Sequence, residues 1–471
     1  MTPYKQELVS LLNENPQNIS SNGKIKISKK GWFTRIIILS GIFAILGYNL
    51  EVGVRLADPL ILYSIIVPLH SLIILLIGWA FYRNPSKGKI GNELVSVIIP
   101  IFNQEHMIAD VIRAVDKSTY KNIEIIAIND GSTDRTKEIL DELKITIPRL
   151  KVINNKNEGK RKAVASGFIL SKGKFIILVD SDSIIDKNGI VEFLKTFNAN
   201  PRIGAVVGNA ISWNSRKNIL TKCQDVWYDV TFNIHKACES TFGTVLCCSG
   251  CFSGYRREAL AEFIPIWSQA KLATSDDRQL TSLTISKSWA KKELLLAFAN
   301  KTLGSASKFD DAEDRVLTAQ ALVEWRSVYV ASAIVYTDVP ENLGNFVKQQ
   351  LRWKKGCIRT NFFVSGFFWN KHPLMALIFY LEFMTSFSFP LVLITVFLYE
   401  PLVLNEYFLP VVYLIGILLL GIGEGFDSKF RNHKSKNWIY KPIMNLISLF
   451  ILSWIVIPAL LSLRKNQWMT R

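Results

Sequence analysis

The chain has 471 residues, which is too long for one ordinary domain and long enough for a globular domain plus membrane segments. Hydrophobic residues make up 49% of it and concentrate near the two ends, which argues against a purely soluble enzyme. The net charge of +17 is typical of basic flanks beside membrane segments, and no zinc-finger or RNP-like signature supports nucleic-acid binding. We therefore expect the lipid bilayer to be a partner and nucleic acid not to be one.

The N-terminal part is predicted to be a polar tail over 1–31, without a cleavable signal peptide, followed by two transmembrane helices within 32–82. Each apolar segment approaches the ~20 residues that span a bilayer. Lysine and arginine are frequent at 24–35 and at 83–89, on the outer side of both segments. The positive-inside rule then predicts that the following domain is cytoplasmic, in an integral protein of the plasma membrane.

Short apolar runs alternate with helical patterns after residue 90. Strands are predicted over 95–100, 123–128, 151–154 and 175–179, and helices over 108–118, 133–143 and 160–171. This alternation predicts an α/β domain with a doubly wound parallel sheet, extending over 90–360. Ligands bind outside the carboxyl ends of the strands in such sheets, where Asn103, Asp130 and Asp180 fall.

Two carboxylates, Asp180 and Asp182, follow the fourth predicted strand with one residue between them. In a tight turn both can bind one hard cation together with diphosphate oxygens, so Mg²⁺ or Mn²⁺ is the expected cofactor. A turn whose Asp and Ser side chains merely bond the backbone is the structural alternative.

A second acidic pair, Asp276 and Asp277, precedes Arg278. Transfer of a group to a hydroxyl needs one base to take the hydroxyl proton, and either carboxylate has the right chemistry. Adjacent acids at the start of a helix are also a common stabilising feature, so the local pattern leaves both interpretations open.

Two basic segments could bind the phosphate or sugar groups of a ligand. The glycine-containing turn at 157–162 precedes a predicted helix and suits a phosphate group. The segment QQLRW places Gln349, Arg352 and Trp353 together, and arginine suits a diphosphate while tryptophan offers a flat face to a sugar ring. The alternative for this segment is a basic helix next to the membrane.

The C-terminal part is predicted to hold interfacial and transmembrane helices over 361–463. Spans are expected over 374–399 and 408–422, joined by an external connector that carries acids and no basic residue. Basic residues flank the last apolar stretch, 443–463, on both sides, so it is predicted to be interfacial or re-entrant. A fifth true span stays open.

All six cysteines lie in or just after the predicted cytoplasmic domain, so they are expected to be free thiols. Cys248 and Cys251 match the CxxC spacing, but no second pair is present to complete a zinc site. We expect neither a structural metal nor a redox role there.

Taken in chain order, the motifs are IPIFNQE, NDGS, NEGKR, DSDS, SGCFSGYRRE, TSDDRQLT, QQLRW and a terminal WMTR. This ordered set resembles family 2 processive glycosyltransferases, and within them hyaluronan synthases and chitin or chitin-oligosaccharide synthases. The resemblance spans about residues 95–471. It implies a GT-A-type fold and a membrane-embedded inverting β-transfer from a UDP-sugar donor to a growing polysaccharide, which the enzyme also exports.

The resemblance also implies roles for the matching residues. Nucleotide-sugar binding is implied for Pro100, Asn103, Asp130, Lys160, Arg161, Asp180, Arg352, Trp468, Thr470 and Arg471. Asp277 matches the base, with Asp276 and Arg278 beside it, and Asp180 and Asp182 match the metal motif, with Asp182 contacting the ion most directly. Acceptor binding is implied for Gln349, Trp353, Ser253 and Cys251. The terminal segment 464–471 matches a gate that covers the nucleotide.

Several positions depart from the family pattern. Ser275 and Met469 stand where glycine is usual, and Cys251-Phe252 replaces the Pro-Leu of hyaluronan synthases near the acceptor. The product therefore stays open between a chitin-type polymer from UDP-N-acetylglucosamine and a hyaluronan-type polymer that also needs UDP-glucuronate. A non-processive transferase that adds one sugar to a lipid carrier is the alternative, although it would not need QxxRW and WxTR together. An inactive membrane subunit or transporter is disfavoured because all candidate acids are present.

Overall fold

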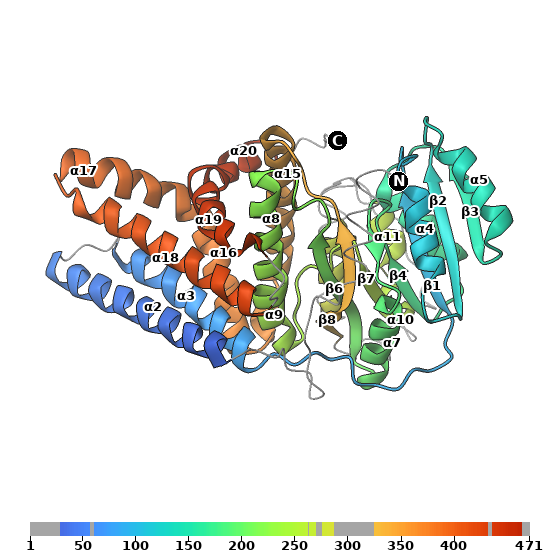
Figure 1. Ribbon diagram of the computed structural model, residues 1–471, viewed down its shortest axis with the longest axis horizontal. Helices are drawn as coiled ribbons and strands as arrows, with labels where there is room; N and C mark the ends of the chain where they lie inside the picture. The colour runs from blue at the N-terminus through green and yellow to red at the C-terminus, as the bar shows by residue number, and fades with distance from the viewer. Residues whose placement is uncertain are drawn as a thin grey trace.

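The computed structural model describes residues 29–56, 61–261, 263–269, 276–286, 325–431 and 436–463. The predicted gate residues Trp468, Thr470 and Arg471, the motif residue Ser275 and most of the polar tail lie outside them. The molecule has an α/β domain at one end and a helical bundle at the other, with α8, α9 and α15 between them (Figure 1).

Within the described residues, eight strands form one sheet in the order β3-β2-β1-β4-β7-β6-β8-β5. Their bounds are β1 Val95–Ile101, β2 Ile123–Asp130, β3 Leu150–Asn155, β4 Phe175–Leu178, β5 Ile184–Ile185, β6 Ile203–Ser212, β7 Ser253–Arg256 and β8 Arg326–Thr337. The pairs β3-β2, β2-β1 and β1-β4 are parallel, as predicted. The expectation of a wholly parallel sheet is wrong, because β7 runs antiparallel to β4 and β6 and β5 runs antiparallel to β8.

Three of the four predicted strands are fully buried, whereas the fourth, β3, is partly exposed. Every residue of β1, β2 and β4 is buried, which is why no alternation of polar and apolar residues marks them. The strand order reverses between β1 and β4, and in α/β sheets such a reversal opens a crevice at the carboxyl ends of the strands. This crevice is where the predicted site residues should meet.

The helices of this domain are α4 Ile108–Asp116, α5 Thr136–Thr146, α6 Lys160–Leu170, α7 Gly189–Ala199, α8 Ile219–Val230, the π-helical turn η1 Thr231–Lys236, α9 Ala237–Phe242, α10 Arg257–Leu260, α11 Ile264–Gln269, α12 Asp276–Ile285 and α15 Leu343–Ser365. Of these, α4, α5 and α6 were predicted, and each of their ends lies within about three residues of the predicted one. In α4, the buried residues recur every three to four positions, as expected for a helix that covers a sheet.

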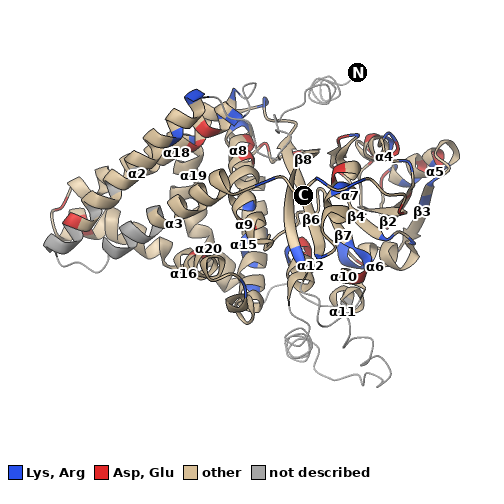
Figure 2. Cartoon of the chain, turned by 90° about the horizontal axis from the view of Figure 1, so that it is seen from below, with Lys and Arg blue, Asp and Glu red and all other residues tan. Residues whose placement is uncertain are grey.

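The bundle contains the apolar segments from both ends of the chain. Its elements are α2 Lys29–Leu56, α3 Ile61–Ala80, η2 Phe368–Asn370, α16 Pro373–Ile394, η3 Thr395–Tyr399, α17 Glu400–Val403, α18 Phe408–Arg431, η4 Asn437–Tyr440, α19 Lys441–Phe450, η5 Leu452–Ile455 and α20 Val456–Leu461. Figure 2 shows long stretches of this bundle without charged residues, whereas charges gather where it meets the α/β domain.

Four helical stretches among the described residues are long and apolar enough to cross a membrane, namely Lys29–Tyr48, Pro373–Val403, Phe408–Arg431 and Asn437–Leu461. The second predicted span is represented by the shorter apolar helix Leu69–Ala80 within α3. By length and composition the last stretch can cross, although α19, η5 and α20 divide it into short pieces. Its interfacial path stays a prediction.

Buried ion pairs join the bundle to the α/β domain. Asp427 on α18 accepts from Arg35 on α2 at 2.9 Å and from Arg431 at 2.7 Å. Arg431 also pairs with Asp229 on α8 at 2.9 Å. Because removing one partner of such a pair leaves a buried charge uncompensated, the network fixes α2, α18 and α8 relative to one another.

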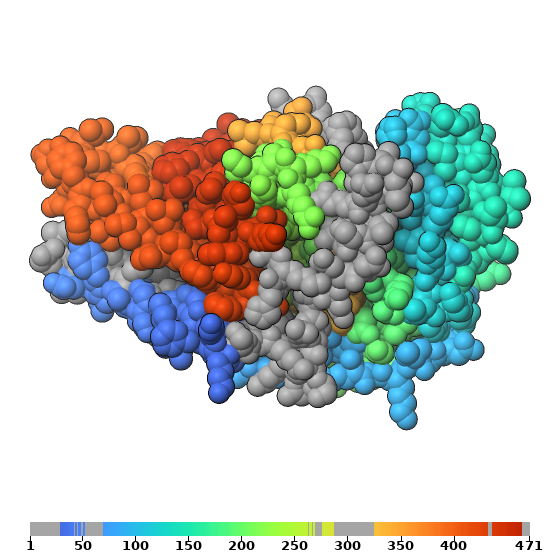
Figure 3. Space-filling view, viewed as in Figure 1, coloured from blue at the N-terminus to red at the C-terminus, as the bar shows by residue number. Residues whose placement is uncertain are grey.

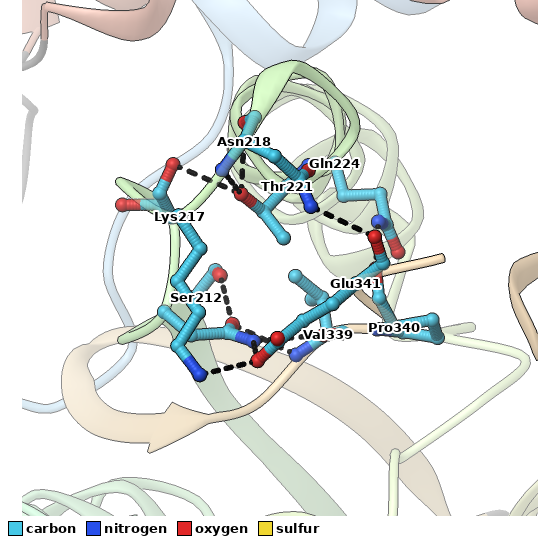
Figure 4. A network of polar contacts seen from close by, with 10 residues as sticks. Ser212, Lys217, Asn218, Thr221, Gln224, Val339, Pro340 and Glu341 are labelled. Atoms are coloured by element: carbon cyan, nitrogen blue, oxygen red, sulfur yellow. Dashed lines mark hydrogen bonds and ion pairs between the residues drawn. The ribbon is translucent and has the colours of Figure 1, made fainter. Parts of the chain in front are cut away.

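A second network ties the start of α8 to the segment that leads from β8 into α15 (Figure 4). The buried side-chain amide of Asn214 donates to the carbonyl of Val339 at 2.8 Å and accepts from its N–H at 3.0 Å. Gln224 of α8 donates to the carbonyl of Pro340 at 2.8 Å. In Figure 3 the green surface of α8 and the pale orange surface of α15 accordingly lie side by side between the bundle and the α/β domain.

We predict that Asn214→Ala destabilises the protein by about 2–4 kcal/mol, because both backbone groups of Val339 would lose their partner in a buried place. Denaturant unfolding of the detergent-purified protein measures this difference. Lys217→Ala is the matched control from the same network, since its ion pair with Glu341 is half exposed and such pairs are worth about 0–1 kcal/mol. An equal loss of unfolding free energy in the two variants would contradict the stabilising role assigned to the hydrogen bonds of Asn214.

Candidate active site

The polar residues at the strand ends lie on neighbouring strands, and Asn103 connects the first two loops. It follows β1 with a left-handed φ of 51°, which asparagine tolerates better than most residues. Its side-chain oxygen accepts from the N–H of Thr133 at 2.8 Å, and its own N–H donates to the hydroxyl of Ser132 at 3.0 Å. Asn103 is exposed and thereby holds the loop after β1 against the loop after β2.

Asp130, at the end of β2, is buried and holds the basic turn that precedes α6. Its two carboxylate oxygens accept from the N–H groups of Glu158 at 3.0 Å and Gly159 at 2.8 Å. Gly159 has φ of 93°, a conformation that suits glycine and strains other residues. The carboxylate of Asp130 therefore positions the first residues of α6, beginning with Lys160.

Lys160 joins the two predicted acidic motifs. Its ammonium lies 2.6 Å from a carboxylate oxygen of Asp180, after β4, and 3.7 Å from one of Asp277, at the start of α12. All three side chains are about a quarter to a third exposed, so a ligand can reach them. Burial acts to lower the pKa of Lys160, but the neighbouring carboxylates outweigh it and raise the pKa above its ordinary value, so the ammonium stays charged.

Asp277 lies in an environment suited to accepting a proton. Burial raises the pKa of its carboxyl above the ordinary value, against the opposing effect of Lys160. A β-carbon at Gly250 would lie 2.7 Å from the Asp277 carboxylate and 2.8 Å from the Lys160 ammonium. A side chain at this position would have to displace both groups, so glycine allows the backbone to approach them closely.

The next residue pair, Arg161 and Asp276, forms a buried contact. Arg161 donates to Asp276 at 2.5 Å and to Gln279 at 2.8 Å, and its guanidinium lies 5.7 Å from the ring of Trp267. Both charged side chains are only 6% exposed. Neither faces an open surface in this geometry, although the sequence pattern had suggested nucleotide binding for Arg161 and catalysis for Asp276. Their contact fastens α12 to α6.

The predicted metal residues, Asp180 and Asp182, are half-buried in the turn after β4. Asp182 accepts a hydrogen bond from the hydroxyl of Ser183 at 3.2 Å. No group of three or more His, Cys, Asp or Glu side chains suited to a metal occurs among the described residues. The donor set is thus two carboxylates, which fits a hard cation whose remaining ligands are water and substrate oxygens.

The predicted acceptor residues separate into accessible and buried ones. Gln349, Arg352 and Trp353 lie on α15 and are partly exposed, and the ring of Trp353 packs 6.4 Å from that of Trp227 on α8. Ser253 is fully buried in β7, so its side chain is closed to an acceptor.

Two other predicted residues, Pro100 and Cys251, lie in different surroundings. Pro100 is buried within β1, where its place opposite Ile128 makes it part of the sheet. Burial and then the negative charges of Asp180 and Asp277 raise the pKa of the Cys251 thiol, which indicates that Cys251 lies near these carboxylates. All six cysteines are free, as predicted.

Arg278 points away from the pair of acids that precede it. Its guanidinium donates to the side-chain oxygen of Asn361 on α15 at 2.7 Å. The start of α12, which carries Asp277, is therefore connected to the helix that carries Gln349 and Trp353. This connection brings the predicted base and the predicted acceptor segment into one rigid arrangement.

Sequence reasoning attached no role to Gly250, Lys236 or Thr281. Gly250 stands inside the quoted motif SGCFSGYRRE, so its small size was the one available signal. Thr281 ends the quoted motif TSDDRQLT, which by itself gives it no role. Lys236 carries no local pattern that distinguishes it from other lysines.

Comparison with known proteins agrees with this geometry. The family model described as Glycosyl transferase family 2 matches residues 96–264. A hyaluronan synthase from Streptococcus pyogenes is 27% identical over 417 residues, covering 87% of this chain and 90% of that protein. An N-acetylglucosaminyltransferase from Azorhizobium caulinodans is 26% identical over 388 residues, covering 80% of this chain and 87% of that protein.

Among solved structures, the mannosyltransferase PcManGT from Pyrobaculum calidifontis, in complex with GDP-Man and Mn²⁺, superposes with a TM-score of 0.47 at 14% identity. The superposition covers 88% of this chain and 98% of that one. The matched family region contains the strand ends that carry Asn103, Asp130 and Asp180. The chain therefore carries a glycosyl transferase family 2 domain next to helices that can cross a membrane, and it is a glycosyltransferase.

Proposed function

We propose that the protein is a membrane-embedded processive inverting β-glycosyltransferase, which polymerises a polysaccharide from UDP-N-acetylglucosamine. One observation carries the proposal: Lys160 lies between Asp180 and Asp277, at the crevice where the strand order reverses. A positive charge between two partly exposed carboxylates suits a diphosphate donor on one side and proton transfer on the other.

In the proposed reaction, Asp277 takes the proton of the acceptor hydroxyl. The acceptor oxygen then forms a bond to the anomeric carbon of the donor, on the face opposite the diphosphate, as the bond from that carbon to the diphosphate breaks. The electron pair leaves with UDP, so the configuration of the sugar inverts. Lys160 offers its ammonium to the diphosphate, and its raised pKa keeps that charge at neutral pH.

Asp180 and Asp182 are the residues that would hold Mg²⁺ or Mn²⁺, because their oxygen donors suit a hard divalent ion. When bound, such an ion neutralises charge on the departing diphosphate. The chain's own contribution is to fix both carboxylates at the end of β4, a fully buried strand that leaves the turn little freedom.

The acceptor is proposed to lie along α15. Trp353 presents a partly exposed ring for a sugar to stack on, and Gln349 lies one helical turn before it on the same side. Because α15 lies between the α/β domain and the helical bundle, a growing polymer held there would lie next to the membrane helices (Figure 1). Trp468, Thr470 and Arg471 are proposed to cover the nucleotide from the terminal segment.

The catalytic domain is proposed to face the cytoplasm, in the plasma membrane. The support is the distribution of charge: basic residues are frequent before α2 and after α3, next to the domain. UDP-sugars made inside the cell would then reach the site directly, and export would proceed through the bundle.

The choice of donor is supported by the names of the relatives, a hyaluronan synthase and an N-acetylglucosaminyltransferase. The test is incorporation of labelled UDP-N-acetylglucosamine by the purified protein, with and without UDP-glucuronate, followed by sizing of the product. Long product from the single donor indicates a chitin-type synthase, and long product that needs both indicates a hyaluronan-type synthase. Single-sugar addition to lipid would contradict processive synthesis.

We predict that Asp277→Asn lowers kcat by about 10²–10⁴-fold, because the amide cannot accept the proton. Donor binding is expected to stay within about twofold, since the change removes a group that acts on the acceptor. Single-turnover transfer and UDP titration measure the two quantities. Asp141→Asn, an exposed change on α5, is the control, and near-normal turnover by Asp277→Asn would overturn the base assignment.

We predict that Asp182→Ala abolishes the stimulation of transfer by Mn²⁺ or Mg²⁺ together with activity, because one of two carboxylate ligands is lost. Calorimetric titration of Mn²⁺ in the presence of UDP gives a readout that does not depend on turnover. Asp186→Ala, in the next turn of the chain, serves as the control. Unchanged Mn²⁺ binding in Asp182→Ala would exclude Asp182 as a ligand.

A further inference from the structure

The helix that begins with α8 passes through a π-helical turn, η1, before it continues as α9. Such turns are rare and frequently occur at functional sites. The last residue of η1 is Lys236, which is 7% exposed and donates from its ammonium to the carbonyl of Cys247. A lysine this deeply buried is uncommon in proteins unless it is paired.

Glu239 acts on the neighbouring peptide group. It follows Lys236 by three residues, so both side chains lie on one face of the helix. Its carboxylate accepts from the N–H of Leu246 at 3.3 Å. Two titratable side chains on one helical face therefore hold two successive residues, Leu246 by its N–H and Cys247 by its carbonyl, and fix the orientation of this segment.

The same segment is held from the opposite side by α12. The N–H of Cys248 donates to the hydroxyl of Thr281 at 2.9 Å, and that hydroxyl donates to the carbonyl of Asp277 at 2.7 Å. Two residues further on, the backbone of Gly250 lies directly against the side chains of Asp277 and Lys160. The backbone from 246 to 250 is thus a bridge from α9 to the proposed base.

The bridge ends at Gly250, where there is little space between the backbone and the neighbouring side chains. At Gly250 even a methyl group would approach the Asp277 and Lys160 side chains to under 3 Å. Displacement of the bridge by a fraction of an ångström toward Asp277 therefore forces that side chain to move. Catalytic groups are sensitive to displacements on this scale, since a shift of about 1 Å can cost about 10²-fold in rate.

We propose that Lys236, together with Glu239, is a positioning residue for glycosyl transfer, which sets the place of the Gly250 backbone against the carboxylate of Asp277. The role of Asp277 as base rests on the proposed function, but the bridge itself does not. Lys236 touches neither donor nor acceptor in this account and acts through the backbone of 246–250.

The kinetic test compares Lys236→Met, which keeps length and loses the donor, with Lys236→Arg, which keeps a charged donor. Lys236→Met is expected to lower kcat by about 10²-fold while KM for the donor stays within about twofold, and Lys236→Arg to recover part of the loss. Lys222→Met is the matched control, because Lys222 lies on the same helical run and contacts Tyr440 instead of the bridge. A normal kcat in Lys236→Met would overturn the proposal.

A second readout is independent of transfer. N-ethylmaleimide alkylation of Cys247 and Cys251, mapped by mass spectrometry, reports on the bridge, and Cys223, fully buried on α8, is the internal reference. Lys236→Met should speed alkylation of Cys247 and Cys251 at least about threefold and leave Cys223 protected. Unchanged alkylation rates of Cys247 and Cys251 would contradict the role of Lys236 in holding the bridge. Faster alkylation of Cys223 as well would show that Lys236 stabilises the whole domain instead. Absence of transfer by the wild-type protein would overturn the proposed function alone.

Discussion

The contact of the Lys160 ammonium with two carboxylates is the interaction on which the arrangement of the site depends. It joins the turn after β4, the start of α6 and the start of α12, three elements that the sheet alone does not bring together. The next residues repeat the pattern, since Arg161 pairs with Asp276. Two successive basic residues of α6 therefore meet two successive acidic residues of α12. The buried pair fixes the helices, which leaves the accessible pair available for chemistry.

Each part of this arrangement has its own support. Asp130 holds the turn that presents Lys160, and the backbone of 246–250, to which Lys236 donates, lies against Asp277 from the other side. Arg278 then connects α12 to α15 through Asn361. Ion pairs of α18 with α2 and α8 join this assembly to the bundle. The site and the membrane-facing helices are consequently fixed relative to each other, as a polymer passing from one to the other would require.

The sequence predicted the parallel half of the sheet well, because continuous apolar runs ending in polar residues are strong local signals for buried strands. The remaining strands, β5 to β8, were not predicted, and the antiparallel β7, whose four residues are SGYR, shows no apolar run. Asn103, Asp130 and Asp180 could be placed at one edge because the alternation of strands and helices fixes which strand ends coincide. The wholly parallel sheet was wrong for the same reason that β7 was missed.

Side-chain pairing was beyond sequence reasoning. Arg161 and Asp276 are 115 residues apart, and nothing in either local pattern shows that they neutralise each other in a buried place. Ser253 belongs to a family motif, yet the register of β7 turns its side chain into the core. Gly250 could have been suspected only from its small size. Such features depend on how distant segments pack, which no single segment specifies.

The most direct test of the central claim is a cryo-EM structure of the purified protein in lipid nanodiscs with UDP-N-acetylglucosamine and Mn²⁺, using Asp277→Asn to prevent turnover. The account predicts density for the diphosphate beside Asp180, Asp182 and Lys160, with the anomeric carbon facing residue 277 and the sugar directed toward α15. Donor density elsewhere on the domain, or a sugar turned away from residue 277, would contradict it.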